Sequence, residues 1–285
     1  MQSRIADALR SPHVPVALLF ADEKPAGAQQ FAEGKWGCLM WLLASAVKGK
    51  TAAVDASTFG CLGGGTGFGF GNRYREWPGG VECFYYFLST GNATRGEEGH
   101  ADTELARSQL RAQSFDHFVH GERYLKSPEV TQSFVKSLPT LQIPARYVIM
   151  KPLAAVDSER ETPVSVTFLV NPDRLSALVV LANYEGPAGE NVIIPWGAGC
   201  QSIGIFTYRE AKAERQRAVV GMTDISARRY MNRHFGRDLL TFSIPFALFE
   251  RMESNVEGSF LEADQWGELL ALEASGASKR SRKES

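Results

Sequence analysis

The sequence predicts an α/β or α+β fold, in which helices flank a mixed β-sheet. Short apolar runs rich in β-branched residues recur along the chain, and segments of helical length separate them. The composition agrees with a packed core, because 44% of the 285 residues are hydrophobic and 22% are charged. Strands and helices that interleave in this way favour a sheet covered by helices.

The elements follow one another in a regular order. Strands are expected at residues 14–20, 51–55, 145–150, 164–170, 191–195 and 239–244. Helices are expected at residues 38–48, 102–117, 128–138, 172–182, 208–220 and 262–273. Two of these helices have start signals: Ser127 can cap a helix whose first residue is Pro128, and another helix begins behind Asn171.

The chain is expected to form one globular unit at residues 1–275, followed by a basic, disordered tail at 276–285. A weak repeat runs through this unit. The order strand, helix, strand and glycine–cysteine turn occurs once before Cys61 and again before Cys200. This order suggests two pseudo-symmetric halves, at about residues 10–140 and 141–260, with the two cysteines facing each other.

The charge and the apolar pattern exclude several classes of partner. The formal net charge is −1, which gives no reason to expect nucleic acid, and the basic run in the tail is short. No apolar run approaches the roughly 18–20 residues of a membrane span, and the N-terminus lacks the apolar core of a signal peptide. Four cysteines are too few for a disulfide framework. We therefore expect a cytoplasmic protein with reduced thiols or metal ligands.

Three of the four cysteines, Cys38, Cys61 and Cys200, directly follow a glycine. A cysteine on such a turn can approach a ligand closely, while backbone N–H groups point at the same object. Three thiolates suit a [4Fe–4S] cluster with one iron left open, and zinc is the second choice. Two alternatives stay open: one thiol is a low-pKa nucleophile of an enzyme, or all three are small buried apolar residues. No CxxC spacing is present, and the role of Cys83 is left open.

The residues around these cysteines are candidates for a ligand pocket. The glycine-rich stretch at 58–71 and the turn at 197–202 are expected to be loops that shape it, through Gly60, Gly63, Gly64, Gly199 and Ser202. The same loops could instead hold a phosphate or nucleotide, although no GK[ST] follows and a P-loop is excluded. Arg228 and Lys151 are candidates for binding a small anionic molecule, and Arg228 could alternatively pair with Asp224 one helical turn away.

Six segments, taken together, resemble a known family. They lie at residues 121–130, 151–153, 171–175, 197–202, 224–228 and 243–245, in the expected order. The chain resembles the uncharacterised ArCR family, a bacterial and archaeal domain of unknown function, over about residues 14–249. The resemblance implies cysteines at the positions of Cys38, Cys61 and Cys200. It implies no activity, so no reaction, substrate or redox partner is predicted.

Overall fold

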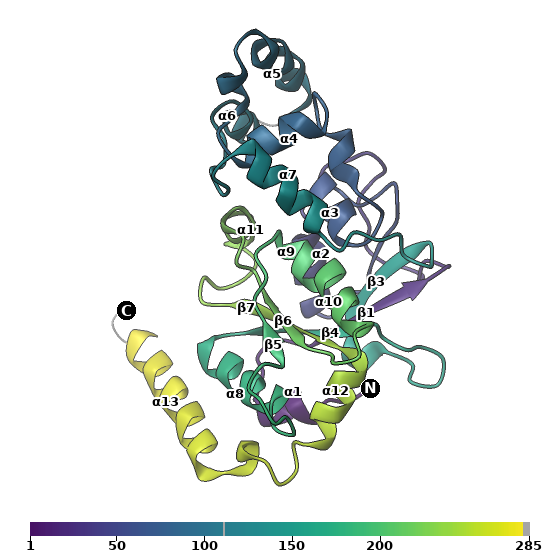
Figure 1. Cartoon of the computed structure of the whole chain (residues 1–285). Helices are drawn as coiled ribbons and strands as arrows, with labels where there is room; N and C mark the ends of the chain where they lie inside the picture. Colours follow the sequence, from purple (N-terminus) through teal and green to yellow (C-terminus); the bar gives the residue numbers. More distant parts are fainter. Residues whose placement is uncertain (111, 282–285) are drawn as a thin grey trace.

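The computed structural model describes residues 1–110 and 112–281, and within them one seven-stranded mixed sheet organises the fold (Figure 1). Its strand order is β2-β3-β1-β4-β7-β6-β5. The strands are β1 (Val16–Ala21), β2 (Ala52–Val54), β3 (Tyr147–Pro152), β4 (Ser165–Val170), β5 (Val192–Ile193), β6 (Ala218–Gly221) and β7 (Leu240–Pro245). All neighbouring strands pair antiparallel except β5 and β6, which are parallel.

Both faces of the sheet are buried, which explains why its strands are apolar runs rather than alternating patterns. In β1, Leu18 points into one hydrophobic core, whereas its neighbours Ala17 and Leu19 point into the other. In β6, Val219 belongs to the first core and Val220 to the second. The sheet therefore separates two cores, and each needs its own layer of helices.

The helices divide between these two faces. The first core lies under α2 (Leu39–Val47), α3 (Leu62–Gly67), α4 (Val81–Leu88), α5 (Glu97–Gln109), α6 (Ala112–His120), α7 (Pro128–Ser137), α9 (Gly199–Gln201), α10 (Thr207–Ala211) and α11 (Ile225–Met231). The second lies under α1 (Arg4–Ala8), α8 (Pro172–Ala182), α12 (Phe246–Ser254) and α13 (Asp264–Ser281). A π-helical turn (Ser202–Phe206) joins α9 to α10, and short 3₁₀ turns lie at Arg73–Glu76, Asn92–Arg95, Leu153–Ala155 and Phe260–Glu262.

Most expected elements are present. All six expected strands are found, and the predicted caps are confirmed, because the Ser127 side chain accepts the Val130 N–H and Asn171 accepts the Arg174 N–H. The helix expected at 208–220 is wrong at its end. It stops at Ala211, and residues 218–221 form β6 in the interior of the sheet. An apolar run of that length fits a strand and the end of a helix equally well, so its position in the sheet decides.

The internal duplication is not confirmed, since the two expected halves do not form separate sheets. β3 from the second half lies between β2 and β1 from the first. Helix α13 extends to residue 281 and so overlaps the expected tail. The last four residues of that tail, 282–285, lie outside the described residues.

Candidate functional site

Each of the three cysteines predicted as ligands stands at the start of a helix. Cys38 is the N-cap of α2, Cys61 is the N-cap of α3, and Cys200 lies in the single turn of α9. Helix α9 packs against both α2 and α3 on the first face of the sheet. The tertiary fold therefore gathers three thiols that are far apart in the sequence.

The three thiols influence one another electrostatically. Burial, together with the nearby Cys61, raises the pKa of the Cys38 thiol to about 12. Burial also raises the pKa of Cys61, and it raises that of Cys200 well above the usual range, with Cys61 and Cys38 adding to the effect on Cys200. Since a thiolate is costly in a low-dielectric site beside other acidic groups, all three are neutral thiols at neutral pH.

Backbone groups contact two of these sulfurs. The Gly64 N–H donates to Cys61 Sγ at 3.3 Å, which satisfies one of the free N–H groups at the start of α3. The Cys200 thiol donates to the Gly63 carbonyl at 3.1 Å. The start of α3 thus touches two of the three cysteines.

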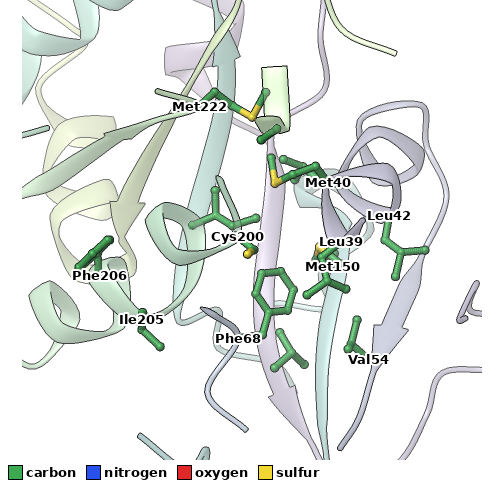
Figure 2. Close-up of a cluster of buried hydrophobic side chains, with 14 of the residues drawn as sticks. Leu39, Met40, Leu42, Val54, Phe68, Met150, Cys200, Ile205, Phe206 and Met222 are labelled. Atoms are coloured by element: carbon green, nitrogen blue, oxygen red, sulfur yellow. The ribbon is translucent and has the colours of Figure 1, made fainter. Parts of the chain in front are cut away.

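Cys200 is the most deeply placed of the three thiols. Figure 2 shows it among the buried side chains of the first core, with its sulfur directed towards Phe68. A thiol in such apolar surroundings resists ionisation, in agreement with its raised pKa.

Asp224 is a fourth acidic group at this place. It is the N-cap of α11, where its carboxylate accepts the Ser226 N–H at 2.9 Å, and it also accepts a backbone hydrogen bond from Gly199 at the start of α9. Burial nevertheless raises its pKa, and its charge raises the pKa of all three thiols. Four helix starts, three with a thiol and one with a carboxylate, therefore meet here.

In this structure, the described side chains are not arranged as a complete set of metal ligands. Over residues 1–110 and 112–281, no three or more His, Cys, Asp or Glu side chains are arranged so that they could hold a metal ion. One reason is visible in the contacts, since the Cys200 thiol is turned onto the Gly63 carbonyl. The predicted ligands are gathered in one region, but they are not preformed as a ligand set.

An aromatic cavity of about 190 Å³ lies beside the thiols, and Cys61, Gly63 and Asp224 form part of its wall. Its other walls are mostly aromatic rings, among them Trp36, Tyr74, Trp77, Phe84, Trp196 and Tyr230. Tyr74 and Phe84 stack with ring centroids 3.9 Å apart, and Gln201 donates to the Tyr74 hydroxyl. An apolar cavity with a few convergent polar groups is the usual form of a small-molecule site.

Sequence reasoning missed a carboxyl group in this cavity, that of Glu122. Its side chain is only 9% exposed, and burial raises its pKa to about 7. Ser226 donates to Glu122 Oε1 at 2.7 Å, the Tyr124 hydroxyl lies 2.9 Å from Ser226 Oγ, and His117 Nδ1 lies 3.3 Å from the same carboxylate oxygen. Glu122 and Tyr124 lie in the segment 121–130 that carries the family resemblance, which was the available signal.

The middle of the glycine-rich stretch is a helix and not a loop, which corrects the prediction. Residues Leu62–Gly67 form helix α3, and its glycines allow very close packing. A Cβ atom at Gly64 would lie 2.7 Å from the Phe59 carbonyl oxygen, and one at Gly60, which has φ +76°, would lie 2.4 Å from the Gly37 carbonyl oxygen. N–H groups of this stretch bond to the backbone of the helix and to the Cys61 sulfur.

The remaining predicted residues lie apart from the cavity. Ser202 is buried and donates to the Gly199 carbonyl at 3.2 Å. Arg228 donates to backbone carbonyls of Met222, Leu239 and Arg237, and it lines a different cavity of about 380 Å³. Lys151, at the end of β3, pairs with Glu161. Arg228 and Lys151 therefore do not face the thiols. The binding of an anionic ligand stays a prediction, and these two residues do not supply positive charge at the cavity.

Cys83 belongs to another part of the protein. Its buried thiol has one proton to donate, and Asp102 Oδ2 at 3.2 Å and the Gly79 carbonyl oxygen at 3.3 Å are both within reach, while Arg95 donates to its sulfur at 3.0 Å. These contacts connect α4, α5 and the turn between them. Cys83 therefore gives a natural control for experiments on the other three thiols.

The fold and the site together define a class: an α+β protein with three thiols and a carboxylate gathered beside an aromatic cavity. A family model described as uncharacterised ArCR matches residues 4–255, so the chain belongs to this family of unknown function. A search of curated proteins and a search of solved structures each gave no match. Among the helices of the described residues, none is long and apolar enough to cross a membrane.

Proposed function

We propose that Cys38, Cys61 and Cys200 bind a soft metal centre, an iron–sulfur cluster first and zinc second, to which the aromatic cavity admits a small molecule. The observation that carries this proposal is the gathering of the three thiols with Asp224, where each acidic group makes the ionisation of the others more difficult. A thiophilic metal relieves that repulsion, because it replaces the thiol protons and balances the thiolate charge.

The ligand chemistry favours a cluster over a single ion. Three thiolates from the chain leave one iron of a [4Fe–4S] cluster open to an outside molecule. Zinc would need a fourth ligand, which Asp224 or water could supply. In either case the Cys200 side chain must turn away from the Gly63 carbonyl, since metal–sulfur bonds are only about 2.3 Å long.

The two competing functions have less support. A cysteine nucleophile needs a depressed pKa, whereas all three thiols have raised ones. A phosphate at the start of α3 would need free backbone N–H groups there, whereas the N–H groups of Gly63 and Gly64 are directed at the Cys61 sulfur. Metal binding is the function for which neutral, gathered thiols are a suitable resting state.

The test is anaerobic purification of the full chain, followed by a visible spectrum and by analysis of iron, zinc and acid-labile sulfide. We expect visible absorption with about four irons per chain. This signal should be lost in Cys38→Ser, Cys61→Ser and Cys200→Ser, but retained in the control Cys83→Ser, whose thiol lies elsewhere. Zinc in place of iron, with the same dependence on the variants, would select the second metal. A metal-free protein that also fails to take up iron with sulfide, or zinc, would overturn the proposal.

A further inference from the structure

The aromatic cavity also carries information about the charge of its ligand. Its rings support one another: Trp196 packs on Phe134 with centroids 4.7 Å apart, and Trp77 packs on Phe84 and Phe87 at 4.9 and 4.6 Å. Rings held in this way form stiff walls with π faces. They suit a small ligand with a flat or apolar body.

The ionisable groups in the cavity wall are mainly acidic. Glu122 and Asp224 contribute carboxyls, Cys61 contributes a thiol, and His117 is the one basic group among the described lining residues. Neither Lys nor Arg is present in that described lining. An anionic ligand would therefore lie against two carboxyls, whereas a cation would be attracted to them and to the aromatic faces.

We propose that this cavity binds an organic cation, a small molecule with a protonated amine or similar nitrogen on an apolar body. The charged nitrogen faces Glu122, and the apolar body lies between the aromatic rings. This inference rests on the proposed function only in taking the cavity as the ligand site, and it does not require a metal at the thiols.

The hydrogen bonds of Glu122 are consistent with this role. Ser226 and His117 both contact Oε1, and within the part of the chain that the structure describes no hydrogen bond to Oε2 is found. The groups that face this carboxyl are His117 from α6, Ser226 and Asp224 at α11, and Tyr124 on the following segment. A cation that binds here stabilises the ionised carboxylate and should therefore bind more tightly as the pH rises through about 7.

The experiment compares three probes of nearly the same shape: phenethylamine as the cation, 2-phenylethanol as the neutral molecule and phenylacetate as the anion. Binding to the full chain is measured by calorimetry and by the fluorescence of the cavity tryptophans. We expect phenethylamine to bind best, and Glu122→Gln to weaken it about tenfold or more. The matched control is Glu250→Gln on the exposed side of α12, which should leave binding unchanged.

Two further measurements keep the outcome clear. If Glu122→Gln does not fold, the pH dependence of phenethylamine binding to the wild-type protein still tests the inference. Phenethylamine should bind more weakly at about pH 6 than at about pH 8. Because the inference does not require a metal at the thiols, the full chain should bind phenethylamine equally well before and after a chelator removes the metal. The inference would be overturned if phenylacetate bound best, or if phenethylamine binding changed neither in Glu122→Gln nor with pH. Neither outcome would bear on whether the three cysteines bind a metal.

Discussion

At the scale of single residues, Glu122 is the most informative side chain of the site. It is an acid kept almost out of water beside another acid, Asp224, and it has one hydrogen bond from Ser226. Burial disfavours its charged form, and the hydrogen bond offsets only part of that cost. A buried carboxyl group of this kind lowers the stability of the folded protein when it ionises. Groups with such perturbed pKa values are concentrated at functional sites, so Glu122 is a candidate functional residue.

This cost predicts a pH dependence of stability. The folded-state pKa of Glu122, about 7, lies above its ordinary value of 4.5, so between these values the folded protein holds a proton that the unfolded chain has released. The free energy of unfolding should therefore fall as the pH rises across this window. Between about pH 5 and pH 8, the free energy of unfolding should fall less for Glu122→Gln than for the wild type. The difference between the two decreases should be up to about 3 kcal/mol.

Urea denaturation of both proteins at several pH values measures this difference. Glu250→Gln serves again as the control, because its carboxyl lies on the exposed side of α12. Parallel curves for the wild type and Glu122→Gln would show that Glu122 has an ordinary pKa in the folded protein.

At the scale of elements, the site depends on how closely α3 approaches α9 and the π-helical turn behind it. Gly67, at the end of α3, has the Cys200 sulfur and the Gln201 backbone nitrogen within 3.0 Å of the position of a Cβ atom. A Cβ atom on Gly204 would lie 2.0 Å from the Gly67 carbonyl oxygen. The absence of side chains at these glycines lets two backbones meet and places Cys61 and Cys200 on the same side of the sheet.

We therefore predict that Gly67→Ala is destabilising. The new methyl group meets the backbone of α9, which cannot move aside as a flexible side chain would, and overpacking of this kind costs about 1–3 kcal/mol. The same change should lower metal binding, because Cys200 moves. Thermal unfolding and metal content are the measurements.

Gly267→Ala is the matched control for this change. Gly267 lies in α13, and a Cβ atom there would meet nothing within 4 Å. Alanine is a better helix former than glycine, so this variant should be more stable by up to about 1 kcal/mol. If Gly67→Ala behaved in the same way, close packing of α3 would not be what holds the site.

At the scale of the whole molecule, the sheet joins parts of the chain that are distant in sequence. β1 pairs with β3 on one side and β4 on the other, and β2 meets the sheet only through β3. Among the described residues, the two strands that lie within 1–140, β1 and β2, do not pair with each other. Apart from a bridge between Gln29 and Ala52, their strand partners come from later in the chain.

This topology predicts that residues 1–140 do not fold alone. The isolated fragment should show no cooperative thermal transition by circular dichroism, since β1 and β2 lack their shared neighbour β3. Co-expression with residues 141–285 should restore a folded complex, which provides the control. A fragment that unfolds cooperatively by itself would contradict the prediction and revive the idea of two independent halves.

Prediction from sequence succeeded where the signal was local. The N-caps Ser127 and Asn171 fix the starts of α7 and α8 through hydrogen bonds within one turn. It failed at α3, because a segment with four glycines among its six residues has a poor intrinsic tendency to form a helix, and tertiary packing overrides that tendency. It also failed at β6, where pairing with β7 and β5 decides between helix and strand.

The sequence by itself determined a mixed sheet flanked by helices, of α/β or α+β class, as well as the six expected strands, the family and the identity of three thiols placed behind glycines. These follow from apolar periodicity, capping residues and local motifs, which act over a few residues. Only the tertiary structure decided that the thiols meet Asp224, that Glu122 is buried beside an aromatic cavity, and that Arg228 and Lys151 are occupied elsewhere. Burial and proximity set the charge states of the site, and both arise from contacts between residues distant in the chain.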